Sequence, residues 1–149
     1  MDDIEERVNN AIGSLLENDS QLLIKDANER TLTQRLAAYL EPLFEGWNVD
    51  CEYNRDLDSV KRLRMRLKPD GPISDRAVLP DIIVHRRGTP ENLLVVEVKK
   101  STNRLPDDQD LRKLEAFQDQ LGYRYACFMR FAAGEEAASL QRSVWLRAP

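Results

Sequence analysis

Three charged residues, Asp81, Glu97 and Lys99, have types and a spacing that suit the binding of a metal ion. Glu97 and Lys99 end the run LLVVEVKK, residues 93–100, where a buried strand would normally carry another aliphatic side chain. A carboxylate in such a strand costs free energy unless a charged or hydrogen-bonding partner lies beside it. The groups that the fold places next to Glu97 therefore decide the chemistry of this segment.

Two apolar runs, 82–84 and 93–99, flank the turn sequence RRGTPEN and predict a β-hairpin. To within one residue of register, this hairpin brings Asp81 beside Glu97 and Lys99. Glu97 and Lys99 are two residues apart, so their side chains share one face of the strand. If Asp81 lies on that face too, two carboxylates and an ammonium group meet at one end of the sheet.

Such a cluster has an electrostatic problem that a cation removes. Two carboxylates about 4 Å apart repel by roughly 4 kcal/mol at an effective dielectric constant of 20. Hard oxygen ligands suit Mg²⁺, with Mn²⁺ as a substitute, and Mg²⁺ commonly takes one or two carboxylates plus substrate phosphate oxygens. A nearby lysine can orient the attacking water or stabilise developing negative charge, which suits phosphodiester hydrolysis. The alternative is an ordinary ion pair at a strand end, with Asp81 a turn former after Pro80.

The pattern Pro80-Asp81, fifteen residues, then Glu97-Val98-Lys99 resembles the signature of the PD-(D/E)XK nuclease superfamily. Asp81 opens a hydrophobic strand, Glu97 closes one, and a predicted helix that carries Glu29 precedes them both. Small bacterial proteins of this superfamily are also similar to the segments YNRD (53–56), PDIIVHRRG (80–88), NLLVVEVKKS (92–101) and LGYRYACFMRF (121–131).

The resemblance implies an α/β fold with a restriction-endonuclease-like αβββαβ core over about residues 27–131 of a single domain, 1–149. Its mixed central sheet would be flanked by helices. The implied activity is Mg²⁺-dependent endonuclease cleavage of DNA. The metal would be held by Asp81, Glu97 and the backbone carbonyl of Val98, Lys99 would act on the attacking water, and Glu29 would hold a metal-bound water. The Gln-x-x-x-Tyr element of exonuclease-type members is not matched, which leaves the cleavage mode open.

Further residues are candidates for contact with nucleic acid. The stretch KRLRMRLK, residues 61–68, has five Lys or Arg among eight residues, so Arg62, Arg64 and Arg66 could follow a phosphate backbone. The alternative is the solvated outer face of a strand. His85 lies four residues after Asp81 and would either touch substrate or cap the hairpin. Lys100, a further candidate, should point away from Lys99 toward solvent.

Composition bounds these hypotheses. The net charge is -4, but residues 55–104 hold twelve Lys or Arg against seven Asp or Glu, so one part of the chain could meet a polyanion. Cys51 and Cys127 form no CxxC pair and are typical of reduced thiols, and no run of 18 apolar residues occurs. A soluble, cytoplasmic protein without membrane contact is expected. A homodimer or a partner protein could supply recognition.

The elements that must position these residues follow from hydrophobic periodicity. Helical spacing predicts helices near 4–16, 27–44 and 111–121, and alternation predicts a strand at 49–53. Runs of β-forming residues predict strands at 82–84, 93–99 and 125–131, with a further one at 143–146. Residues 56–79 could be a short strand or an ordered loop. A nuclease-fold module that binds nucleic acid or a partner protein without cleavage is the alternative function. The intact Asp81, Glu97 and Lys99 favour the enzyme.

Overall fold

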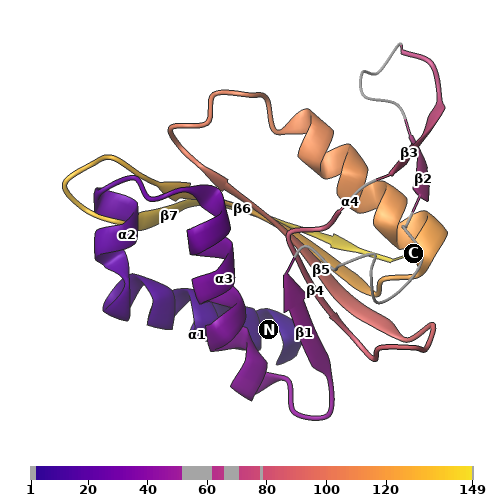
Figure 1. Ribbon diagram of the computed structural model, residues 1–149, viewed down its shortest axis with the longest axis horizontal. Helices are drawn as coiled ribbons and strands as arrows, with labels where there is room; N and C mark the ends of the chain where they lie inside the picture. The colour runs from indigo at the N-terminus through magenta and orange to yellow at the C-terminus, as the bar shows by residue number, and fades with distance from the viewer. Residues whose placement is uncertain (1–2, 52–61, 66–70, 78, 149) are drawn as a thin grey trace.

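The computed structural model describes residues 3–51, 62–65, 71–77 and 79–148. It has an α/β fold in which helices precede a five-stranded mixed sheet and pack on both of its faces (Figure 1). The elements are α1 Asp3–Asn18, α2 Ser20–Ile24, α3 Glu29–Leu40, the 3-10 helix η1 Glu41–Leu43, β1 Asn48–Cys51, β2 Arg62–Met65, β3 Ser74–Ala77, β4 Ile82–His85, β5 Asn92–Lys100, α4 Asp108–Leu121, β6 Tyr125–Ala132 and β7 Ser139–Arg147.

The strands of the main sheet follow the order β1-β4-β5-β6-β7. Neighbours are antiparallel except β5 and β6, which run parallel. Parallel strands cannot be joined by a tight turn, and α4 lies in the crossover between these two. The predicted hairpin of residues 82–99 is present as β4 and β5.

The central strand β5 is buried from Asn92 to Lys99, as expected for a strand covered on both faces. Leu94, Val96 and Val98 belong to the hydrophobic cluster with α1 and α3, whereas Val95 packs with Leu114 and Phe117 of α4. Because side chains alternate along a strand, Glu97 and Lys99 belong to the α4 face.

Local signals explain the helix ends. Asn28 caps α3, and its side chain accepts a hydrogen bond from the Thr31 backbone N–H at 2.8 Å. The helical pattern predicted to reach residue 44 divides into α3 and η1, which has a proline in its first turn. α4 ends at Gly122, whose φ of 72° is a left-handed conformation that glycine adopts without a Cβ clash.

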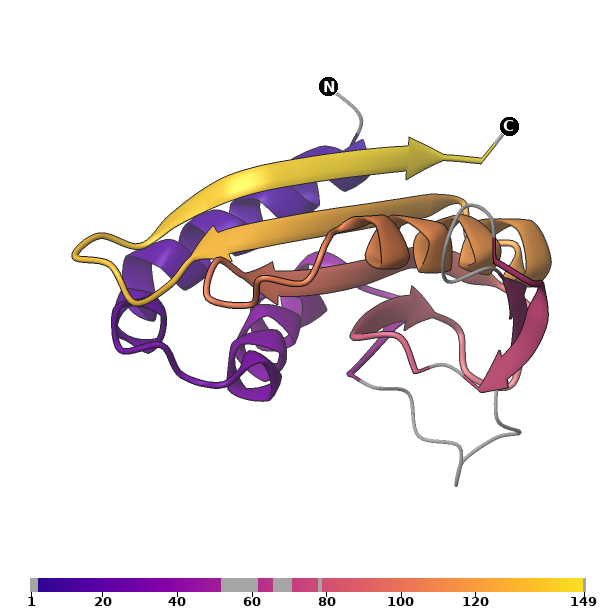
Figure 2. The same ribbon diagram turned by 90° about the horizontal axis from the view of Figure 1, so that it is seen from above.

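Residues 62–65 of the basic stretch form part of a second, two-stranded sheet, so the strand alternative is correct for the described residues of this region. β2 and β3 pair antiparallel, with Arg62 opposite Ala77 and Met65 opposite Ser74. This hairpin lies next to α4, on the side away from the N-terminal helices (Figures 1 and 2). Gln120 of α4 joins it through two hydrogen bonds to the backbone of Arg64, of 2.8 and 2.6 Å.

The last strand is longer than the sequence pattern predicts. β7 covers Ser139–Arg147 and pairs with β6 along most of its length, from Tyr125 opposite Arg147 to Ala132 opposite Ser139. Within the ranges described above, none of the helices combines the length and the apolar character needed to cross a lipid bilayer.

Candidate functional site

Asp81 and Glu97 lie together on the α4 face of the sheet. The register of β4 and β5 pairs Ile82 with Val96 and Ile83 with Val95, so its continuation puts Asp81 opposite Glu97. The Val98 backbone N–H donates a hydrogen bond of 2.8 Å to Asp81 Oδ2 and fixes the orientation of that carboxylate. The observed register lies within the one-residue range expected from the sequence, because it differs by one residue from a pairing of Asp81 with Val98.

Burial makes Glu97 an unusual acid, because its side chain is only 3% exposed. Burial raises the pKa of Glu97 well above its ordinary value, and the neighbouring Asp81 carboxylate raises it further. Lys113 acts in the opposite direction and favours the ionised form. The pKa of Glu97 stays raised in spite of Lys113, which limits the rise.

That cation, Lys113, was not among the residues that sequence reasoning selected. Its Nζ lies 2.5 Å from Glu97 Oε1 and donates a hydrogen bond of 2.7 Å to the Leu79 carbonyl. Burial disfavours the ammonium, but Glu97, Asp81 and Asp110 outweigh burial and raise the pKa of Lys113. The signal that could have found Lys113 is its place in α4, directly before the buried Leu114.

Lys99 lies on the same face as Glu97 but has other partners. Its Nζ donates hydrogen bonds to Asp110 Oδ2 at 2.7 Å and to the Pro106 carbonyl at 3.1 Å. Asp107 Oδ1 is 3.8 Å away, and the Lys99 side chain is only 6% exposed. The lysine of the Glu-x-Lys triplet therefore joins β5 to the beginning of α4.

Asp107 occupies the N-cap position of α4 but makes no side-chain capping hydrogen bond. Its carboxylate instead binds Arg130 and Arg142, the latter at 2.7 Å. Burial alone would raise the pKa of Asp107, but these two guanidinium groups, together with Lys99, lower it below its ordinary value. A chain of ion pairs thus runs from β5 through the first turn of α4 to β6 and β7.

Glu29 and Lys100 lie at the end of β5 and do not join the carboxylate pair. Glu29 Oε2 accepts hydrogen bonds from the Lys100 backbone N–H at 3.2 Å and from Asn103 Nδ2 at 3.3 Å. Lys100 Nζ, expected to reach solvent, donates instead to Asp26 Oδ1 and to the Ala27 carbonyl, both at 2.8 Å. These contacts hold the Glu29 carboxylate beside Lys100, which lies three residues after Glu97 in β5.

His85 is buried, with 3% of its side chain exposed, and its Nε2 lies 2.7 Å from Asp50 Oδ2. Asp50 also binds Arg87. Burial opposes the charge of Asp50, but Arg87 and His85 outweigh burial and lower its pKa. A side chain so enclosed has no surface with which to contact a polyanion, so the structure does not support a substrate contact by His85.

The basic stretch is only partly described. Arg62 begins β2, and Arg64 is exposed within this strand. Arg66 lies outside the described residues. Contact of these arginines with phosphates stays a prediction.

The donor set at the carboxylate pair fits a hard divalent cation. Among the described residues, no cluster of three or more His, Cys, Asp or Glu side chains could hold a metal ion, so side-chain ligation rests on Asp81 and Glu97. Mg²⁺ commonly uses one or two carboxylates and fills its other positions with water and substrate phosphates. The Glu97 carboxylate already binds one cation, the Lys113 ammonium.

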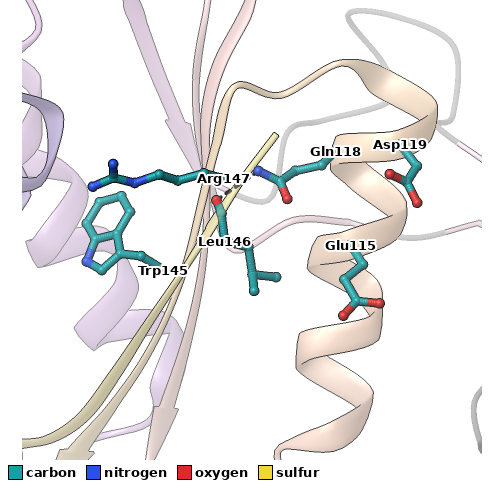
Figure 3. A pocket seen from close by; sticks show the side chains of 6 residues that line it. All are labelled: Glu115, Gln118, Asp119, Trp145, Leu146 and Arg147. Carbon is teal, nitrogen blue, oxygen red and sulfur yellow. Dashed lines mark hydrogen bonds between the residues drawn. The ribbon is translucent and has the colours of Figure 1, made fainter. Parts of the chain in front are cut away.

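A separate hollow lies between α4 and β7 and has a volume of about 390 Å³ (Figure 3). Figure 3 shows Leu146 directed toward α4, whereas Trp145 and Arg147 are directed away from it. Gln118 Nε2 spans the two elements and donates a hydrogen bond of 2.8 Å to the Leu146 carbonyl. Asp81, Glu97, Lys99 and Lys113 do not line this hollow.

Comparisons with known proteins assign no family. No protein-family model matches the chain, and no curated protein matches it either. Among solved structures, the crystal structure of SSO0001 is similar, with a TM-score of 0.40 and 14% sequence identity. The alignment covers 98% of this chain and 66% of that structure, slightly less than two thirds of its length. A likeness of this size does not establish a shared fold or function.

Proposed function

We propose that this protein is a metal-dependent nuclease of the PD-(D/E)XK type, which hydrolyses phosphodiester bonds of DNA. The observation that carries the proposal is the Asp81–Glu97 pair, a half-buried carboxylate directly before β4 beside a buried carboxylate in β5. The order α3, β1, β4, β5, α4, β6 supports it, because this series reads αβββαβ with a parallel last strand.

In this proposal Asp81 and Glu97 hold Mg²⁺ or Mn²⁺, together with the backbone carbonyl of Val98. The bound ion would supply Lewis-acid charge and lower the pKa of a coordinated water. The Val98 N–H keeps the Asp81 carboxylate turned toward Glu97. Lys99 positions α4 beside the carboxylate pair through its hydrogen bond to Asp110. Glu29 stabilises the end of β5 by accepting the Lys100 backbone N–H.

The β2–β3 hairpin is the proposed contact with the nucleic acid backbone. Arg62, Arg64 and Arg66 alternate along the basic stretch, and Arg64 is exposed. Phosphate contacts of this kind supply affinity that does not depend on base sequence. Because Gln120 fastens the hairpin to α4, the hairpin and the carboxylate pair are positioned by the same helix.

A second candidate function is a module that binds nucleic acid without cleaving it. One observation favours it: two of the three charges of the motif already have a partner of opposite sign, Lys113 for Glu97 and Asp110 for Lys99. A site neutralised in this way is stable without a metal ion.

A nuclease assay tests both candidates. The full chain is incubated with single-stranded DNA, duplex DNA or RNA in Mg²⁺, Mn²⁺ or EDTA, beside Asp81→Asn and a control, Glu91→Gln in the exposed turn. The nuclease proposal predicts cleavage that requires the metal, disappears in Asp81→Asn and persists in the control. Cleavage in EDTA or by Asp81→Asn would contradict it. Retained binding without cleavage by the parent would favour the module.

A further inference from the structure

The ammonium group of Lys113 lies where it contacts a proposed metal ligand directly. Nζ is 2.5 Å from Glu97 Oε1 and 2.7 Å from the Leu79 carbonyl oxygen, two residues before Asp81. The Lys113 side chain is only 19% exposed. The ammonium is thus held between β5 and the segment that leads into β4.

A metal ion bound to Glu97 would lie close to this ammonium, whichever carboxylate oxygen it takes. Mg²⁺ requires ligand oxygens at about 2.0–2.1 Å in near-octahedral geometry. An ion at that distance from Glu97 Oε1 would meet a positive ammonium already in contact with the same oxygen. Two cations at one carboxylate oxygen repel each other strongly in a buried site, where solvent screening is weak.

We propose that Lys113 is a built-in counter-cation that competes with the divalent metal ion for Glu97. The inference rests on the proposed function, because it concerns the same carboxylate pair. Without metal, Lys113 neutralises Glu97 and holds α4 against the sheet. When metal binds Oε1, its charge displaces the ammonium from that oxygen, and when metal binds the other carboxylate oxygen, the two neighbouring cations still repel each other. The competition lowers the affinity of the site for metal. The position of the Lys113 ammonium therefore determines how readily the site binds the ion.

Metal affinity in the absence of substrate tests this competition. Mn²⁺ binding to the full chain is measured by calorimetric titration at mildly alkaline pH for the parent, Lys113→Met, Lys113→Gln and Lys113→Arg. Removal of the ammonium in Lys113→Met or Lys113→Gln should tighten Mn²⁺ binding about tenfold or more. Lys113→Arg keeps the positive charge and should stay within a fewfold of the parent.

Lys25→Met is the matched control, because Lys25 is exposed in the turn after α2 and its loss changes the net charge equally. It should leave Mn²⁺ affinity near that of the parent. Circular dichroism and thermal melts verify folding of each variant, and Lys113→Gln, whose polar amide keeps a hydrogen-bond donor, serves if Lys113→Met does not fold.

Two results would overturn the inference: unchanged or weaker Mn²⁺ binding in the folded Lys113 variants, or no Mn²⁺ binding by any protein in the series. Failure of the nuclease proposal looks different. If Mn²⁺ binds more tightly to Lys113→Met while the parent cleaves no nucleic acid, the competition stands and the nuclease function does not.

Discussion

Lys99 Nζ lies 2.7 Å from Asp110 Oδ2, so the last residue of the Glu-x-Lys triplet is joined to the first turn of α4. Two residues earlier, Glu97 is joined to Lys113 of the same helix. Two ion pairs of opposite sense thus join the strand to the helix: the acid Glu97 of β5 pairs with the base Lys113 of α4, and the base Lys99 of β5 pairs with the acid Asp110 of α4. If α4 shifted along β5 and brought Asp110 toward Glu97, like charges would meet, so the two pairs fix the register of the helix on the sheet.

The Lys99–Asp110 pair should matter for stability. Lys99→Met leaves Asp110 without its ammonium partner, and we expect it to lower the free energy of unfolding by roughly 2–3 kcal/mol. This is less than for a fully enclosed pair, because the Asp110 side chain is 27% exposed. Asp110→Asn should add much less in the Lys99→Met background than alone, which urea denaturation of the four-protein cycle measures.

The Arg7–Asp3 pair of α1 is the control for this cycle. It is an i,i+4 pair whose Arg7 guanidinium also lies over the Phe44 ring, so Arg7→Met should cost about 1 kcal/mol, less than Lys99→Met. Additive effects of Lys99→Met and Asp110→Asn would contradict a direct interaction between these two side chains.

The raised pKa of Glu97 predicts a pH dependence with a definite sign. The unfolded chain ionises this carboxyl near pH 4.3, whereas the folded protein holds it neutral to higher pH. Between these two pKa values the folded state binds more protons, so the contribution of Glu97 to stability falls as pH rises. The raised pKa of Lys113 acts only at alkaline pH, above this window.

The double variant Glu97→Gln, Lys113→Met removes both titrating groups. Its stability relative to the parent should increase as pH rises from about 4 toward neutrality, as measured by urea denaturation at a series of pH values. A well-packed neutral pair often equals or exceeds a buried ion pair in stability. A relative stability that decreases over this interval would show that Glu97 is more acidic in the folded protein than in the unfolded chain.

If the protein is the proposed nuclease, the carboxylate pair should act as a unit in catalysis. Asp81→Asn and Glu97→Gln should each lower kcat/KM for DNA cleavage by about 100-fold or more, and the double variant should be little worse than either single one. Steady-state cleavage with Mg²⁺ measures this, on proteins whose folding is verified by circular dichroism. Multiplicative losses would assign the two carboxylates to independent roles.

The basic stretch should control affinity without affecting base preference. If Arg62, Arg64 and Arg66 bind phosphates, their joint replacement by Gln should weaken binding equally across DNA sequences. Each lost contact should reduce the slope of log K against log salt by about 0.9. Fluorescence anisotropy at several salt concentrations measures the slope. A triple variant that binds like the parent would leave this stretch as a solvated strand.

Sequence patterns predicted the parts of the fold that local chemistry decides. The apolar runs of β4 and β5 and the turn between them specify a hairpin, and side-chain alternation places Asp81 and Glu97 on one face. The longer β7 was underestimated, because residues 139–143 are mostly polar and exposed at the edge of the sheet.

The partners of the charged residues could not be predicted in the same way. Which polar residues of α4 face β5 depends on the rotation of the helix, and tertiary packing of Leu114 and Phe117 decides this rotation. The prediction that Lys100 reaches solvent was wrong because Asp26, 74 residues earlier in the chain, approaches it only in the folded protein. Likewise, 35 residues separate His85 from Asp50, its buried partner.

Gln120 bonds to the main chain of the β2–β3 hairpin: the Gln120 amide nitrogen donates to the Arg64 carbonyl, and the Gln120 amide oxygen accepts from the Arg64 N–H. A single side chain thereby imitates the edge of a neighbouring strand. Because these two hydrogen bonds do not involve the side chain at position 64, that side chain can change while both bonds are kept. Substitution of this exposed residue can therefore alter the surface of the hairpin without loss of its link to Gln120.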